Sequence, residues 1–396
     1  MALPKITINY LNGLLGTVAE SEDGLLALVT NGTAVSTTFA LGTPYTIYRY
    51  SALADLGVTA ENNPALEKMV REFYQEAPEG TKVIILAYAD TKTMSDLCDV
   101  ATGDLKTFLT AQNGAIRGIV LGRQPASGYT PVTSDGLDSD IFAALPKAQA
   151  LADFAKETLN APIFVILEGR NFVSASALKT LATETKNKAM IFIGDTVVSS
   201  DDAAIGILAG RIASIPVQRN IGRVKDGALY PSAMYIGAKL VENAIDDATT
   251  INDKGYVTLR NYVGKAGYFF TDDRMACIST DDYAHLANRR VIDKACRIAN
   301  LTMTEQLLDE VYINEDGTMQ PAIIKHWESL VEDAIASAMT ANGELSADFT
   351  KGEKGCTCFI DATQNVLSTS KIEMTLKVRP FGYARDIVIN LGFQVA

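Results

Sequence analysis

Residues 371–396 alternate between apolar and polar side chains in the way that two successive β-strands would. A Pro380-Phe381-Gly382 turn separates the two runs, and the second run extends to Ala396. Its apolar side chains share one face and are Ile387, Ile389, Leu391, Phe393 and Val395. A strand this apolar needs a partner, because its backbone groups and its apolar face would otherwise stay uncovered.

The other end of the chain carries the same pattern, because Ile6, Ile8 and Tyr10 alternate with polar residues directly after Pro4. Both termini are therefore predicted to be strands. Ordered termini are usually tied to their own sheet, which would give a monomer. The alternative is β-augmentation, in which each arm adds a strand to the open sheet edge of a neighbouring copy and builds a polymer. The alternation of apolar and polar residues is compatible with pairing inside one chain and with pairing between copies.

Composition favours a globular protein of two domains. With 396 residues, 47% apolar and 21% charged, the chain can bury a large core. Its five cysteines follow no framework spacing, so thiols are expected rather than disulfides. The net charge of −12 argues against a nucleic-acid partner. Neither a signal peptide nor a membrane-spanning run is recognisable, so we expect synthesis in the cytosol and no membrane insertion.

The first part of the chain predicts an α/β domain. Continuous apolar runs predict strands at residues 83–89, 116–121, 162–167 and 189–193. The helices predicted between and after them include residues 64–74, 145–159 and 201–214. Strands of this kind form a mostly parallel sheet with helices on both faces.

From residue 256 the pattern changes to α+β. A strand-rich stretch at 256–277 precedes helices at 281–299 and 321–339, and a further strand follows at 356–360. We therefore expect four segments along the chain. They are an N-terminal strand arm (1–20), an α/β domain (21–255), an α+β domain (256–380) and a C-terminal strand arm (381–396).

One set of residues suggests catalysis. Asp90, Glu168 and Asp195 each follow a predicted parallel strand, at the edge where open α/β sheets bind ligands. Three carboxylates there could hold Mg²⁺ for a hydrolase. They could also cap the helices that follow by accepting free backbone N–H groups, and no histidine, lysine or nucleophile stands at a fixed spacing from them. We favour capping and predict no enzymatic activity, cofactor or metal.

Two charged helix faces are candidate contact surfaces. Arg290, Lys294 and Arg297 recur at i, i+4 and i+7 and form a basic stripe in an acidic protein. An acidic face of the next helix holds Glu328, Glu332 and Asp333. Each face is either solvated or complementary to a partner of opposite charge, such as a neighbouring copy.

The order of elements carries more information than any single motif. Two helices, the strand Cys356-Thr357-Cys358-Phe359-Ile360 and the two terminal runs follow one another, and in this the chain resembles contractile tail sheath proteins of bacteriophages and related injection systems. A second similarity is the Leu53-Ala54-Asp55-Leu56-Gly57 turn before a helix that feeds a strand. The resemblance covers residues 43–89 and 256–396, while residues 301–320 depart from the family's compact helix pair.

This resemblance implies an outer mostly parallel α/β domain and a C-terminal α+β sheath-type domain, with extended β-strand arms at both termini. Arms from two neighbouring copies would complete the sheet of the C-terminal domain and weave a helical homo-polymer around an inner tail tube protein. The intersubunit residues expected in these arms are Ile6, Ile8, Tyr10, Ile387, Ile389, Leu391 and Phe393.

The resemblance also implies further partners and a location. One helix of the C-terminal domain would face the tube, and the candidate residues are Arg290, Lys294, Arg297 and Lys325. Baseplate and tail terminator proteins would bind the ends of the sleeve, in a particle assembled in the bacterial host cytoplasm. Contraction would drive the tube through a target envelope. The alternatives are the Mg²⁺-dependent hydrolase and a related baseplate or tail-terminating protein that forms a ring.

Overall fold

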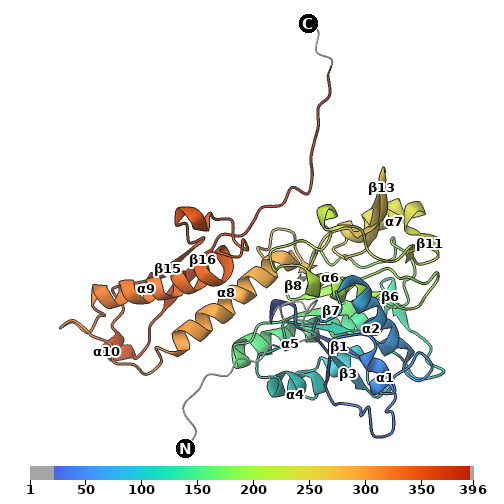
Figure 1. The fold of residues 1–396 in the computed structure, drawn as a ribbon, viewed down its shortest axis with the longest axis horizontal. Helices are drawn as coiled ribbons and strands as arrows, with labels where there is room; N and C mark the ends of the chain where they lie inside the picture. Colours follow the sequence, from blue (N-terminus) through green and yellow to red (C-terminus); the bar gives the residue numbers. More distant parts are fainter. Residues whose placement is uncertain (1–21, 393–396) are drawn as a thin grey trace, which may run out of the picture. The chain divides into compact units, whose positions relative to one another are not determined.

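The computed structural model describes residues 22–392 (Figure 1). The predicted arm residues Ile6, Ile8, Tyr10 and Phe393 lie outside the described residues. The chain divides into two compact units, of which the first extends to Arg289 and the second begins at Arg290. Helix α8 (Leu286–Thr304) contains this division.

A six-stranded sheet forms the centre of the first unit, with the strand order β2-β3-β1-β4-β7-β9. All neighbours pair in parallel except β2, which is antiparallel to β3. The strands are β1 (Leu26–Asn31), β2 (Tyr45–Ile47), β3 (Val83–Tyr88), β4 (Gly118–Leu121), β7 (Phe164–Glu168) and β9 (Ala189–Phe192). The predicted mostly parallel sheet is confirmed.

Helices cover both faces of this sheet. Helices α2 (Pro64–Glu76) and α6 (Ile205–Ser214) pack together and against β1, whereas α5 (Ser139–Leu159) packs against β7 and β9. Helix α2 connects β1 to β3, and α5 connects β4 to β7, so the two connections run in opposite directions across the sheet. Right-handed crossovers that run in opposite directions place their helices on opposite faces. The core is therefore enclosed on both sides.

The remaining elements of the first unit are short. The helices are η1 (Glu22–Gly24), α1 (Ala52–Asp55), α3 (Met94–Leu97), α4 (Asp104–Ala111), η2 (Val224–Asp226), η3 (Val241–Asn243) and α7 (Ile245–Asp253). The strands are β5 (Thr133–Ser134), β6 (Leu137–Asp138), β8 (Thr185–Lys186), β10 (Tyr235–Ile236), β11 (Lys239–Leu240), β12 (Leu259–Tyr262), β13 (Lys265–Phe270) and β14 (Ala276–Cys277).

The central strand β1 was not among the predicted strands. Its whole length is buried between β3 and β4, and its apolar run directly follows the arm that we expected to end at residue 20. The run Leu25-Leu26-Ala27-Leu28-Val29 is the signal that identifies it. The side chains of β1 do not alternate between apolar and polar, so the sequence pattern does not give its position in the sheet. Its pairing with β3 and β4 shows that it is central.

The division between the units falls later than the predicted boundary at residues 255 and 256. The backbone N–H of Ile193 donates to the carbonyl of Val257 at 2.9 Å, and the N–H of Val257 donates to the carbonyl of Ile191 at 3.1 Å. Val257 therefore forms a parallel bridge with the β9 edge. The strand-rich stretch is confirmed, but it belongs to the first unit, where β12 pairs with β13 and β14 pairs with β8.

The second unit packs a helix against a two-stranded antiparallel sheet. It contains the end of α8, then α9 (Pro321–Ile335), the π-helix η4 (Ala336–Thr340), η5 (Phe349–Lys351), β15 (Cys356–Ile360), α10 (Val366–Thr369) and β16 (Met374–Val378). A small core joins Ile324 and Trp327 of α9 to Ile360 of β15. The predicted strand at residues 356–360 is confirmed.

The C-terminal arm differs from its prediction. Residues 380–392 contain no strand, and Figure 1 draws them as an extended trace without an arrow. The alternation identified residues suited to a strand, but a strand exists only where another backbone supplies hydrogen bonds. Within the described residues, β16 pairs with β15 of its own chain and the arm pairs with no strand.

Two glycines allow α6 to contact α2 closely. A Cβ at Gly206 would lie 2.3 Å from the carbonyl oxygen of Met69, and one at Gly210 would lie 2.4 Å from that of Phe73. The G-x-x-x-G spacing of Gly206 and Gly210 in a short amphipathic helix predicts close packing against the sheet. The close packing is present, but its partner is the neighbouring helix.

We expect Gly210→Ala to lower the free energy of unfolding by about 1–3 kcal/mol, because the helix backbones must separate. Alanine would otherwise favour an α-helix over glycine by about 1 kcal/mol, so a net loss isolates the clash. Denaturant unfolding measures the change. Gly382→Ala is the control, since a Cβ there has no neighbour within 4 Å. Equal stability of the two variants would contradict this packing.

Candidate functional site

The β15–β16 pair has two different edges. Arg379 N–H donates to the carbonyl of Gly355 at 2.8 Å, so these residues form a hydrogen-bonded pair directly beyond β16. Bonded and non-bonded pairs alternate in an antiparallel ladder. In this register Cys358 and Leu376 face each other as a non-bonded pair, as do Ile360 and Met374. The backbone groups of these residues therefore point outward, to the two edges of the sheet.

The β15 edge is covered by carboxylates of α9. The N–H of Cys358 donates to Glu332 Oε1 at 2.9 Å, and the N–H of Ile360 donates to Glu328 Oε1 at 2.9 Å. Glu328 is only 5% exposed. The acidic face predicted on this helix is therefore largely turned toward the sheet, and of its three residues only Asp333 remains well exposed.

The buried stripe of α9 is shifted from the predicted one. The apolar periodicity of residues 321–339 predicts a stripe of Ile323, Trp327, Leu330, Ala334 and Ala338. The deepest side chains are instead Ile324, Trp327, Glu328, Val331 and Ile335. Apolar periodicity cannot place a glutamate inside, but the free N–H of Ile360 gives this carboxylate a partner there.

The β16 edge has no such cover. Among the described residues, no side chain or backbone group bonds to the outward backbone groups of Met374, Leu376 or Val378. Their side chains are half-buried on the α9 side of the sheet, while Thr375 and Lys377 are exposed on the other side. This edge is open to a further strand.

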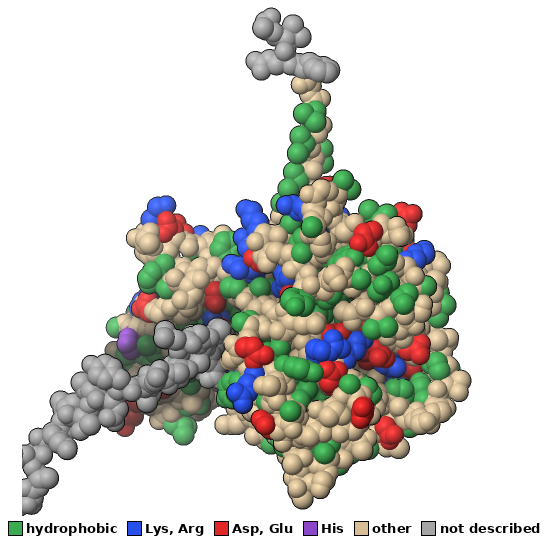
Figure 2. Space-filling model, turned by 45° about the vertical axis from the view of Figure 1, so that its right-hand side comes forward, with side chains coloured by type: hydrophobic (Ala, Val, Ile, Leu, Met, Phe, Trp, Pro, Cys, Tyr) green, Lys and Arg blue, Asp and Glu red, His purple; other side chains and the backbone are tan. Residues whose placement is uncertain are grey.

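The described part of the C-terminal arm carries unburied apolar side chains. Ile387, Ile389 and Leu391 are 72%, 75% and 94% exposed. Figure 2 shows hydrophobic side chains along the extended segment that leads to the C-terminus. An open edge and an uncovered apolar strand sequence thus occur in the same unit.

The three predicted catalytic acids do not meet. Asp90 is exposed after β3, whereas Glu168 is the buried last residue of β7 and Asp195 is buried beyond the end of β9. Strands β1 and β4 separate β3 from β7, which places Asp90 about 14 Å away at ordinary strand spacing. The hypothesis of a shared Mg²⁺ is therefore wrong, because carboxylates that bind one ion must approach it within about 2–2.6 Å.

Glu168 has a structural role instead. Its Oε2 accepts the N–H of Arg123 at 2.8 Å, and its Oε1 accepts the N–H of Ala203 at 3.0 Å, just before α6. Arg170 lies beside it and bonds to Asp202. Burial raises the pKa of Glu168 to about 7, although Arg170 opposes the shift. This acid holds two loops at the sheet edge. It does not cap a helix as predicted, because Ala203 lies before the Ala204 N-cap of α6, and helix α3 is capped by Thr93 rather than by Asp90.

Asp195 is held by a lysine of α2. Lys68 Nζ lies 2.6 Å and 2.8 Å from the two carboxylate oxygens. Burial works against the charge of Lys68, but Glu72 and Asp195 outweigh it and raise its pKa. Burial raises the pKa of Glu72 to about 8, and Thr196 Oγ1 donates to its Oε1 at 2.9 Å.

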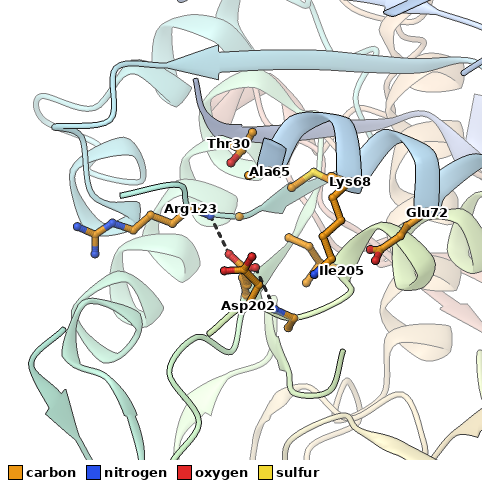
Figure 3. A pocket seen from close by; sticks show the side chains of 11 residues that line it. Thr30, Ala65, Lys68, Glu72, Arg123, Asp202 and Ile205 are labelled. Carbon is orange, nitrogen blue, oxygen red and sulfur yellow. Dashed lines mark hydrogen bonds between the residues drawn. The ribbon is translucent and has the colours of Figure 1, made fainter. Parts of the chain in front are cut away.

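The crevice at the carboxyl edge of the sheet is filled. A cavity of about 10 Å³ lies there between Thr30, Lys68, Glu72 and Glu168, which is space for about one water molecule. Figure 3 shows Lys68 and Glu72 entering it from α2, while the guanidinium of Arg123 points away. The place where open α/β sheets bind substrates has no room for one here.

The predicted basic stripe is not a continuous exposed surface. Arg290 is buried, and Lys294 Nζ lies 2.7 Å from a carboxylate oxygen of Glu344. Arg297 is half-buried. Lys325 has a side chain that is 77% exposed and an ion pair with Glu328. Helical spacing predicted that Arg290, Lys294 and Arg297 share one face, but it could not show that Glu344, distant in the sequence, forms an ion pair with Lys294.

A histidine cluster was missed by the sequence analysis. His285 Nδ1 lies 2.8 Å from Asp273 Oδ1, and Asn220 donates to both Asp272 and Asp273. The N–H of Ala287 donates to Asp273 Oδ2 at 2.8 Å, so this buried acid caps the start of α8. The helix accordingly begins five residues after the predicted start at 281. These bonds occupy the carboxylate of Asp273.

All five cysteines are free thiols, as predicted. Cys356 and Cys358 share the face of β15 that packs on α9, and Cys356 Sγ lies 3.6 Å from the carbonyl of Glu332. Burial raises the pKa of Cys356 to about 11.

No helix within the described residues is both long and apolar enough to cross a membrane.

Comparison with known families covers almost the whole chain. Residues 3–274 match the DUF2586 N-terminal domain, and residues 282–396 match the DUF2586 C-terminal domain. A relative from Haemophilus phage HP1 (strain HP1c1), named "Putative tail sheath protein", is 27% identical over 195 residues. The match covers 47% of this chain and 49% of the relative, so the chain spans about half the length of this curated relative.

Solved structures share the fold over nearly the full length. The helical sheath of the anti-feeding prophage in its contracted state has a TM-score of 0.63 at 13% identity, covering 99% of each chain. The sheath complex of the extracellular contractile injection system PVC, also contracted, has a TM-score of 0.62 at 13% identity, covering 100% of this chain and 98% of the other. At these identities the likeness concerns the fold alone. The predicted resemblance to sheath proteins is confirmed.

The buried carboxyl of Glu72 predicts a pH effect on stability. The folded chain keeps its proton up to about pH 8, whereas an unfolded glutamic acid releases it near pH 4.3. The contribution of the protonated Glu72 carboxyl to the unfolding free energy is thus fully present below pH 4.3 and is lost as the pH rises through 8. In Glu72→Gln we expect the fall in unfolding free energy between pH 5 and pH 8.5 to shrink by roughly 1–3 kcal/mol.

Denaturant unfolding at several pH values measures this difference. Glu61→Gln serves as the control, because Glu61 is exposed and should leave the wild-type pH profile unchanged. A parallel pH profile for wild type and Glu72→Gln would show that Glu72 is already ionised in the folded chain.

Proposed function

The chain belongs to the DUF2586 family, and from this membership and the sheath fold we propose that it is a structural subunit of a contractile tail sheath. The observation that carries the proposal is the exposed apolar face of the arm, formed by Ile387, Ile389 and Leu391, together with a β16 edge that is open among residues 22–392. An apolar strand sequence in one copy can pair with such an edge in the next copy. The role is structural rather than enzymatic.

Strand exchange of this kind produces a helix of subunits. The arm and the edge are different surfaces, so each copy both gives and receives, and such a heterologous contact need not close into a dimer. Burying five arm side chains yields about 7–15 kcal/mol, and ordering ten residues costs about 10–20 kcal/mol. One arm alone is therefore marginal, and assembly depends on several contacts formed together.

The N-terminal arm is part of the same proposal. Ile6, Ile8 and Tyr10 would supply a second exchanged strand, and Phe393 would continue the C-terminal one. The woven segments are then residues 1–20 and 381–396, around the α/β and α+β domains. During contraction the domains would move as rigid bodies while these strands stay paired.

The sleeve would enclose an inner tube protein and end at baseplate and terminator proteins, in a phage tail or contractile injection particle assembled in the host cytoplasm. Among the four tube-facing candidates, Lys325 is the most exposed, and Arg297 is half-buried. Arg290 and Lys294 are better suited to holding the domain together, since one is buried and the other pairs with Glu344. We keep Lys325 as the first residue to test for tube contact.

Ile389→Asp tests the exchange without truncating the chain. The change places a carboxylate on the apolar face of the arm, and we expect the critical concentration for assembly to rise roughly 10–100-fold, since about 1.5–3 kcal/mol of burial is lost per contact. Sedimentation velocity and negative-stain microscopy measure the assembly. Removing residues 386–396 should abolish assembly and leave the fold intact.

Asn390→Asp is the matched control, because it adds the same charge to the opposite face of the same segment. We expect its critical concentration to stay within about twofold of wild type. Small uniform particles of wild-type protein at every concentration and salt would refute the sheath proposal, as would unaltered assembly of the Ile389→Asp variant.

A further inference from the structure

We propose that Glu328 and Glu332 close the β15 edge of the free subunit, so that a strand from a second copy of the chain docks on the β16 edge alone. The identity of the docking strand rests on the proposed function. The closure itself rests only on contacts within the second unit. It gives the two edges of one small sheet different roles.

The carboxylates occupy positions that strand carbonyls would take. Glu332 Oε1 and Glu328 Oε1 accept the N–H groups of Cys358 and Ile360, alternate residues that point away from β16. An incoming strand on this side would offer carbonyls to the same two N–H groups. It could enter only by displacing both carboxylates, and helix α9 itself flanks this strand.

Two lysines hold these carboxylates in place. Lys325 pairs with Glu328, and Lys354 Nζ lies 3.1 Å from Glu332 Oε2. Burial works against the charge of Glu328, but Lys325 and the N–H of Ile360 outweigh it and lower its pKa, so this side chain is ionised at neutral pH. Displacing Glu328 would leave a buried charge without its backbone partner, which is unfavourable.

The β16 edge offers the opposite properties. Its outward backbone groups are unoccupied within the described residues, and Met374, Leu376 and Val378 form a half-buried apolar row beside it. The arm carries apolar side chains at the same period of two, with Ile387, Ile389 and Leu391 on one face. Placed beside β16, that face would extend the apolar row toward α9, and Asn390 would point to the solvated side.

A single receiving edge has a consequence for assembly. A sheet with two open edges can pair in either direction and grow into disordered aggregates. With β15 closed, each copy accepts exchanged strands on the β16 side only, and the polymer grows with one polarity. The glutamates therefore select the direction of growth.

Hydrogen exchange measured by mass spectrometry on the full-length chain tests the closure. In the double variant Glu328→Ala/Glu332→Ala, at concentrations below assembly, we expect residues 356–360 to exchange at least tenfold faster than in wild type. Asp333→Ala is the matched control, because this neighbouring carboxylate pairs with Lys354 but accepts no β15 N–H. Unchanged exchange in the double variant would overturn the closure.

Single substitutions keep the test usable if the double variant does not fold. Glu332 is partly exposed, so Glu332→Ala should fold and expose the Cys358 N–H, whereas Glu332→Gln retains an acceptor oxygen and should preserve protection. If alanine and glutamine give the same exchange, the carboxylate does not cover this edge.

Assembly of wild type tests the choice of edge. We expect residues 374–378 to become protected on assembly, while residues 356–360 keep the protection that they already have. Glu332→Ala should assemble at a lower concentration and yield irregular aggregates beside tubes. Assembly without new protection at residues 374–378 would overturn the edge assignment. Absence of any wild-type assembly would instead refute the sheath proposal and leave the closure to be judged by exchange.

Discussion

The hydrogen-bonding capacity of strand edges governs this structure. Every strand presents backbone N–H and C=O groups on two sides, and burial without partners is costly. In the first unit the sheet satisfies them by pairing six strands, with the segment around Val257 extending the β9 edge. In the second unit only two strands pair, so each edge needs another solution. Glutamate side chains cover one edge, and the other is open as far as the described residues 22–392 show.

Carboxylates in both units bond to backbone N–H groups. Glu168 accepts N–H groups from two loops at the end of the large sheet, and Asp273 caps helix α8. Glu328 and Glu332 do the same for β15. Each of these four carboxylates also lies within ion-pair distance of a lysine, arginine or histidine. The acids that suggested an enzyme in the sequence are part of this general use of carboxylates as backbone acceptors.

Similarity to sheath proteins gives these local observations a common purpose. A filled sheet crevice removes the usual substrate site of an open α/β fold, and rigid packing of α6 on α2 through glycines suits a domain that moves as one body. In the proposed sheath subunit, the functional surface is the edge of a small sheet and an apolar arm.

The sequence alone determined the elements with clear local patterns: the parallel strands β3, β4, β7 and β9, the helices at α2, α5, α6 and α9, the strand at residues 356–360 and the alternation of the terminal arm. These depend on local patterns. It could not identify β1 as the central strand, place Glu328 inside the second unit, or show that Lys294 meets Glu344, because each depends on residues distant in the chain. The sequence predicted that the arm needs a partner. Only the tertiary structure decided which edge of the small sheet is covered, since that depends on where side chains of α9 reach the backbone of β15.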